Sequence, residues 1–233
     1  MFILFFLLFN FFLSFSSAYA SQYEVSSGHC PQLTSNDFVL QLVKSFEDEN
    51  SLKFLKKIVV KNNLDKKNFL SSYKISYHPL KKKLMFILDC PIPIMQVQIY
   101  RENTEPYVGI LAEDNKIYDA EYEKILKKEG LLDYDLPNLA LPLGEQAEIL
   151  QKKVTFFFKD IDLNFRKKIS EIIFNDKQEM IMILASAKGP TSVFLGSDGW
   201  KEKMKQLPKI VSHSENQKHF SVIYMNGEKI VVK

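Results

Sequence analysis

Arginine and cysteine are scarce in this sequence of 233 residues, and each scarcity argues against a class of protein. Only two of the 31 basic residues are arginines, Arg101 and Arg166. Because bidentate recognition of phosphate and guanine favours arginine, this usage argues against a nucleic-acid-binding protein. The two cysteines, Cys30 and Cys90, are far apart and form no CxxC motif, which argues against a redox or zinc site.

Catalytic and cofactor-binding motifs are also missing. The chain has no HExxH pair, GxSxG elbow or P-loop, and its four histidines are scattered at His29, His78, His213 and His219. Asp160 and Asp162 stand in a lysine-flanked stretch without a nearby histidine, so we interpret them as a solvated turn rather than an acid/base pair. Residues 196–199 (GSDG) are typical of a turn that caps the following helix. We therefore expect no enzyme, no cofactor and no metal.

The first 20 residues carry no charged side chain and hold 7 of the 19 phenylalanines. They end in Ala18, Tyr19 and Ala20, a small-x-small pattern that a signal peptidase accepts. As a helix they would span about 30 Å, the thickness of a bilayer core. The segment is thus either a cleaved signal peptide or a retained anchor, and both predict an exported chain. In an oxidising compartment Cys30 and Cys90 can form one disulfide, which the sequence alone does not decide.

Charge is unevenly distributed. Residues 53–83 contain ten lysines and a single acid, Asp65, although the whole chain has a net charge of only +3. Such a block is most often a solvated face. A second interpretation places it against anionic lipid headgroups near the N-terminal segment.

The N-terminal part of the chain predicts a small α+β region. Residues 21–35 are polar and turn-rich, which is typical of a linker. Ser35, Asn36 and Asp37 can cap a helix whose apolar residues recur at helical spacing up to Phe46. Residues 54–62 fit either a helix or a strand. Residues 73–77 and 84–88 predict a hairpin, after which Pro91 and Pro93 form a rigid corner and a plausible domain boundary.

The C-terminal part predicts an antiparallel sheet packed against helices. The strands are expected at residues 94–100, 107–113, 116–118, 169–174, 180–185 and 191–195. Helices are expected at residues 120–128, from Gly144 onward, and after Gly199, while residues 136–143 form a proline-rich loop. Residues 220–225 and 228–232 flank Asn226 and Gly227, the strongest short hairpin signal in the sequence.

The order of these elements resembles the extracytoplasmic part of the FtsQ/DivIB family of bacterial cell-division proteins. Residues 73–89 (YKISYHPLKKKLMFILD) lead a hairpin into a proline corner, and residues 109–119 (GILAEDNKIYD) give a strand, an acidic turn and a short strand. Residues 136–144 (LPNLALPLG) stand where the family has a leucine- and proline-containing loop. The later segments follow in family order: KKISEIIFN, MIMILASAKG, VFLGSDGWKEKMKQLPKI and HFSVIYMNGEKIVV. The shared order and spacing carry the resemblance.

The resemblance implies a non-catalytic scaffold that recruits division proteins of the FtsB/FtsL type. It implies a POTRA-like α+β domain at residues 36–90, short or irregular for the family, and an FtsQ-like β domain at residues 91–233. It also implies the periplasmic side of the inner membrane, at the division septum, as the location. The alternative is a secreted or periplasmic binding module of the same fold, soluble after signal cleavage and without a division role.

The family binds partners by strand addition at its final strands, and the residues allow the same interpretation. If residues 228–232 form the last strand of an open sheet, one row of their main-chain groups can pair with another chain. Ile230 and Val232 can instead face the core, and packing is the simpler explanation of Trp200. The candidate partner-binding residues are Tyr224, Lys229, Val231, Lys233 and Trp200.

Overall fold

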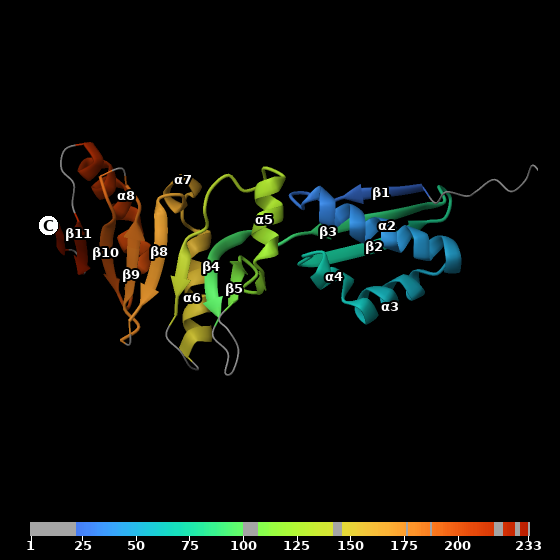
Figure 1. Cartoon of the computed structure of the whole chain (residues 1–233), viewed down its shortest axis with the longest axis horizontal. Coiled ribbons are helices and arrows are strands. Elements are labelled where there is room, and N and C mark those ends of the chain that lie inside the picture. The colour runs from blue at the N-terminus through green and yellow to red at the C-terminus, as the bar shows by residue number, and fades with distance from the viewer. Residues whose placement is uncertain are drawn as a thin grey trace, which may run out of the picture. The chain divides into compact units, whose positions relative to one another are not determined.

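The computed structural model describes residues 22–99, 107–141, 146–175, 177–186, 188–216, 221–226 and 229–232. The chain divides into two compact units, residues 1–90 and 91–233 (Figure 1). The expected signal peptide or anchor, residues 1–20, lies outside the described residues. Within the described ranges, no helix combines the length and the apolar character needed to cross a bilayer.

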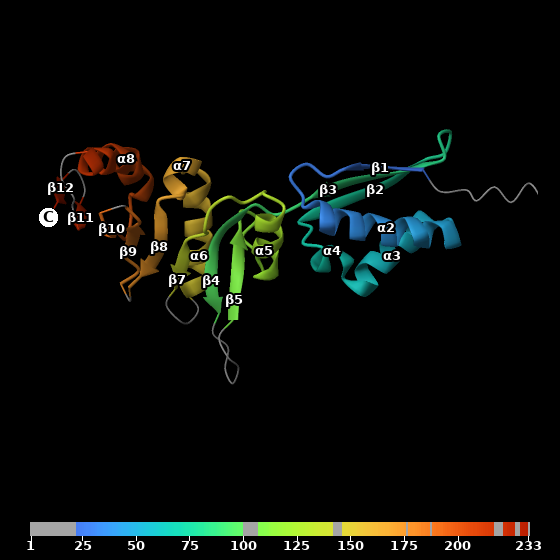
Figure 2. The ribbon, with the colours of Figure 1, turned by 45° about the horizontal axis from the view of Figure 1, so that its top comes forward.

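The first unit is a three-stranded sheet with helices on one face (Figure 2). Its strand order is β1-β3-β2, with β1 parallel and β2 antiparallel to β3. The elements along the chain are β1 (Gln22–Ser26), α2 (Gln32–Glu49), α3 (Leu52–Asn62), α4 (Leu64–Lys67), β2 (Ser72–His78) and β3 (Lys83–Asp89).

The core of the first unit follows from two periodicities. On β3 the alternate residues Leu84, Phe86 and Leu88 are buried, whereas Ile87 on the other face is 46% exposed. On α2 the buried Phe38, Leu42 and Phe46 recur at helical spacing and join the same cluster. The predicted hairpin is thereby confirmed as β2 and β3. Residues 54–62, for which the sequence allowed two interpretations, lie in helix α3.

Two boundaries of the first unit differ from the sequence prediction. Residues 21–35, expected to be a linker, contain β1 and the start of α2, so the unit begins well before residue 36. The side-chain pattern does not reveal β1 because this strand is mostly exposed and is held by main-chain pairing with β3. The helix begins at Gln32, so Ser35 lies inside its first turn and does not cap it: the Ser35 hydroxyl is buried and donates to the Pro31 carbonyl at 2.7 Å.

A disulfide joins Cys30, just before α2, to Cys90, just after β3. Both cysteines are buried, and their Cα atoms are 5.1 Å apart. The His29 Nε2 atom donates to the Cys90 carbonyl at 2.7 Å. The bond therefore closes most of the first unit into a covalent loop.

The second unit is built on one sheet, whose nine described strands follow the order β12-β11-β10-β9-β8-β7-β4-β5-β6. The strands are β4 (Pro93–Ile99), β5 (Tyr107–Ala112), β6 (Ile117–Asp119), β7 (Asn138–Ala140), β8 (Ile169–Phe174), β9 (Met180–Leu184), β10 (Thr191–Gly196), β11 (Val222–Asn226) and β12 (Lys229–Val232). The helices are α5 (Glu121–Lys128), α6 (Gln146–Lys159), α7 (Leu163–Arg166) and α8 (Trp200–Asn216). Most neighbouring strands are antiparallel, so the predicted α+β class is confirmed.

The helices cover the two faces of this sheet unequally. Residues of α6 and α8 share one core with the sheet, and this core includes Val154, Phe158, Leu207, Met182, Val193 and Ile223. Helix α5 lies on the opposite face at the β4 end, because Glu123 accepts a hydrogen bond of 2.7 Å from Gln96, which alternates with the buried Met95 and Val97. Among the described elements, no helix covers the face of β8 to β12 that lies opposite α6 and α8.

One expected loop is partly a strand. Residues 136–143 contain β7, which runs parallel to both β4 and β8 and joins the two halves of the sheet. The prolines do not interrupt the pairing because Pro137 precedes the strand and contributes only its carbonyl, which accepts from the Gln96 N–H at 2.9 Å. The main chain, rather than an apolar pattern, therefore defines β7.

Among the described residues, each unit has a hydrophobic core of its own. The core of the first unit draws on residues between Val25 and Cys90, and that of the second on residues between Ile94 and Met225. A chain that begins at Ser21 therefore retains every described residue of both cores.

Candidate protein-binding edge

Strand β12 stands at the end of the nine-stranded sheet and pairs with β11 alone among the described strands. An edge strand presents one row of main-chain N–H and C=O groups that its neighbour does not use. Val231 and Val232 are 49% and 37% exposed, so apolar side chains accompany this row. We refer to β12 and the adjoining open face of β11 as the terminal edge.

The register of the strands brings apolar side chains into one row across the uncovered face. Tyr224 stands directly opposite Val231, and Phe194 is the partner of both Tyr224 and Ile181. The row continues through Ile173 to Ala140 on β7. Tyr224 is 40% exposed, and Phe194 and Ile181 are half-buried. An apolar row thus leads from the middle of the sheet to the terminal edge.

The rings of Phe194 and Tyr224 stack, with centroids 4.7 Å apart and an angle of 16° between the planes. They come from β10 and β11, which are parallel neighbours connected through α8. Each ring limits the rotation of the other. A side chain with restricted rotation loses less entropy when it makes a further contact.

The structure brings together only some of the residues predicted from the sequence. Tyr224 and Val231 meet at the terminal edge. Lys229 belongs to β12, but its side chain lies outside the described part, as does all of Lys233. Asn226, expected in the turn, ends β11 and pairs with Lys229.

Trp200 has a packing role instead. It is 9% exposed, and its indole N–H donates to the Gly196 carbonyl at 2.9 Å. Its ring contacts Phe157 of α6 and Phe174 of β8, at centroid distances of 5.9 and 5.7 Å. These contacts belong to the core on the helical face, and none of them is with β11 or β12. Its inclusion among the partner-binding candidates is therefore not supported by its contacts.

Sequence reasoning did not identify Phe194, which supports Tyr224. The alternation in residues 191–195 predicts a strand, but it does not show which strand will lie beside β10. That neighbour, β11, is reached only after the whole of α8. The sequence shows only that Phe194 is an aromatic residue within an expected strand. Its contact with Tyr224 follows from the register of β10 and β11.

The acidic pair has structural contacts. The Asp160 carboxylate forms an ion pair with Lys201 at 2.6 Å. Asp162 caps α7, accepting from the N–H groups of Asn164 and Phe165. Both residues line a groove of about 570 Å³ between α6, α7 and α8, whose apolar walls include Phe157 and Met204. Asp160 thus links the end of α6 to α8, and Asp162 holds the start of α7.

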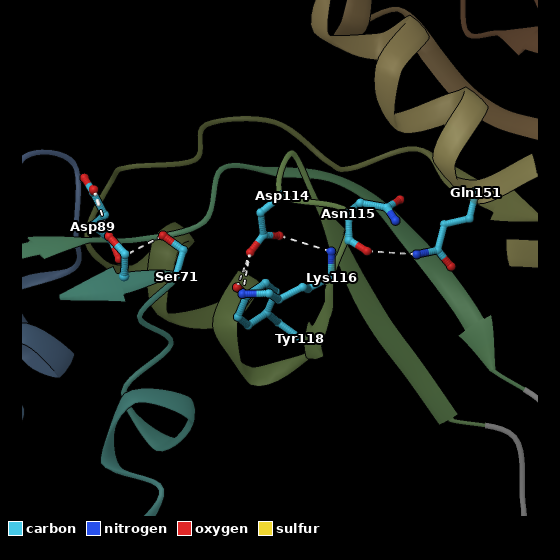
Figure 3. Close-up of polar contacts among 8 residues, drawn as sticks. Ser71, Asp89, Asp114, Asn115, Lys116, Tyr118 and Gln151 are labelled. Atoms are coloured by element: carbon cyan, nitrogen blue, oxygen red, sulfur yellow. Dashed lines mark hydrogen bonds and ion pairs between the residues drawn. The ribbon is translucent and has the colours of Figure 1, made fainter. Parts of the chain in front are cut away.

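A second polar cluster fastens the turn between β5 and β6 (Figure 3). Asp114 accepts from the Tyr118 hydroxyl at 2.6 Å and from the Lys116 N–H at 3.1 Å. Asn115 accepts from the Gln151 amide at 3.1 Å, which ties the turn to α6. Burial and the Asp114 carboxylate raise the pKa of Tyr118. Hydrogen bonds within the unit account for this cluster, so we assign it to folding rather than to ligand binding.

The described part of the chain holds no group of three or more histidine, cysteine, aspartate and glutamate side chains arranged to bind a metal. No protein-family model matches the sequence, and no curated protein matches it.

Proposed function

We propose that this chain is a non-catalytic extracytoplasmic scaffold of the bacterial cell-division machinery. It binds division proteins of the FtsB/FtsL type by strand addition at the terminal edge. The first unit serves as a POTRA-type domain and the second as an FtsQ-type β domain. Residues 1–20 direct export, and the site of action is the division septum on the periplasmic side of the inner membrane.

The observation that carries this proposal is the position of β12 at the open end of the sheet. A partner strand placed beside β12 would extend the sheet, pairing with its unused main-chain groups. Tyr224 and Val231 lie side by side on the open face and offer apolar contact area. Main-chain pairing would supply affinity, and the exposed side chains would select the partner.

The first unit supports the proposal as well. It is a small α+β unit in which one strand is followed by the successive helices α2 and α3, the single turn α4 and a returning hairpin, and the three strands form a mixed sheet with the helices on one face (Figure 2). Its first strand begins two residues after the apolar segment, and its last strand ends just before the proline corner. This is the place in the chain that a POTRA-type domain requires.

The test is the cellular position of a fusion to a fluorophore that matures after export. The fluorophore is joined through a flexible linker to the C-terminus and expressed from the native locus. We expect a band at the division site. A diffuse periplasmic signal, with division unaffected when the gene is removed, would contradict the scaffold role and support a binding module of the same fold.

A further inference from the structure

One face of helix α3 is formed almost entirely by lysines. Lys53, Lys56, Lys57 and Lys61 are exposed and follow one another at helical spacing, so they share a side of the helix. The short α4 adds the exposed Lys66 and Lys67. We call these six residues the lysine face.

Few acidic residues balance the positive charge of the lysine face. Across residues 52–67 the only acid is the half-buried Asp65. No ion pair between described residues involves any of the six lysines, whereas Lys83 nearby in the sequence is paired with Glu24 at 2.7 Å. The adjacent helix α2 has the opposite character, with Asp37, Glu47 and Asp48 exposed. The positive charge of α3 and α4 is therefore not balanced by acids within these two helices.

Apolar side chains stand among these charges. Val60 is 70% exposed, and its position places it between Lys56, Lys57 and Lys61 on the same side of α3. Phe54 is 36% exposed beside them. A helix that shows lysines around exposed apolar residues is suited to a lipid surface, where the charges meet phosphates and the apolar groups reach the acyl boundary.

The chain also enters the first unit in a way that favours membrane proximity. Residue 22, the first of β1, pairs with Lys83 at the start of β3. The uncharged N-terminal segment ends only two residues earlier. Gln22 thus lies beside the turn of the β2–β3 hairpin, where Leu80 is 91% exposed and Lys81 and Lys82 are exposed. A retained segment would therefore hold the unit within reach of a bilayer.

We propose that the lysine face binds the headgroups of anionic phospholipids on the membrane surface. Lysine suits this role because its compact charge needs no fixed geometry with a phosphate, unlike the bidentate contacts of arginine. The lysine face lies on the first unit and the terminal edge on the second, so this inference does not rest on the proposed division role. It also applies whether the N-terminal segment is retained or removed.

The test uses the chain that begins at Ser21, so that the apolar segment does not cause binding. Its co-sedimentation is measured with vesicles of phosphatidylcholine alone and of phosphatidylcholine mixed with phosphatidylglycerol. We expect binding only to the mixed vesicles, weakened by added salt. The variant with Lys53, Lys56, Lys57 and Lys61 changed to Gln is expected to bind about 100-fold more weakly or worse.

The matched control removes the same charge elsewhere. Lys124, Lys128, Lys177 and Lys209 are exposed residues of the second unit, and changing all four to Gln is expected to leave binding nearly unchanged. Circular dichroism melting of both variants shows whether they fold. Equal loss in both variants, retained binding by the α3 variant, or binding that does not depend on phosphatidylglycerol would each overturn the proposal. Failure here would leave the septal position of the fusion protein unaffected.

Discussion

Tyr122 is the largest fully buried side chain in the described part of the molecule, and its hydroxyl donates to the Pro91 carbonyl at 2.7 Å. Burial first, and then the charge of Asp114, raise its pKa above the ordinary tyrosine value. Tyr118 beside it is shifted in the same direction. The neutral forms of both hydroxyls therefore belong to the folded state.

This shift predicts a loss of stability in alkali. Above about pH 10 the unfolded chain releases tyrosine protons that the folded chain retains, so the free energy of unfolding falls as the pH rises. Tyr122→Phe removes one such proton and should make this fall less steep by up to about 1.4 kcal/mol per pH unit. At neutral pH the same change should cost about 1 kcal/mol, because the Pro91 carbonyl loses its donor. Urea unfolding at several pH values measures both effects, and an unchanged slope in the variant would contradict the assignment.

At the scale of single residues, the sequence shows which reactive groups and motifs are present, but it does not show which residues come into contact. The lone cysteines and the absence of catalytic motifs can be read directly from the sequence. Whether Cys30 meets Cys90 depends on β1 and β3 lying side by side, which no local pattern indicates. The contacts of the Trp200 ring are equally hidden from the sequence, because Phe157 and Phe174 belong to other elements.

At the scale of elements, a strand could be predicted where apolar and polar side chains alternate along it. The strands β8, β9 and β10 alternate between buried and less buried residues, and they lie close to where the sequence places them. The short strands β1 and β7 have few buried side chains and depend on main-chain pairing with neighbours that are distant in sequence. The terminal hairpin could be predicted, but the row from Ile173 to Val231 could not, because it requires the register of five strands.

If the terminal edge binds a partner strand, proline substitutions at the adjacent residues Val231 and Val232 should have different effects. Successive N–H groups of a strand point to opposite sides, so of Val231 and Val232 one faces β11 and the other faces outward. Val231→Pro and Val232→Pro each remove one donor. One variant should lower the melting temperature by breaking the hairpin, and the other should melt normally yet lose binding to an FtsB/FtsL-type pair. Each serves as the control for the other, and normal partner binding by the variant that melts normally would count against strand addition.

At the scale of the whole molecule, two cores imply two unfolding reactions. The disulfide and its loop belong entirely to the first unit, whereas the only tryptophan, Trp200, is buried in the core of the second. Tryptophan fluorescence therefore reports the second unit alone, while far-ultraviolet circular dichroism reports both. The molecule thus allows each unit to be followed separately in one sample.

Replacing both Cys30 and Cys90 with Ser should therefore destabilise one unit selectively. Opening a loop of 60 residues is expected to lower the free energy of unfolding of the first unit by about 2–4 kcal/mol, because the unfolded chain gains freedom. In urea, the circular dichroism signal should then show an earlier transition, while the Trp200 fluorescence midpoint stays in place. Reduction of the unmodified chain should have the same effect, and the Ser variant should not respond to reductant. A fluorescence midpoint that moves together with the circular dichroism signal would mean that the two cores unfold as one.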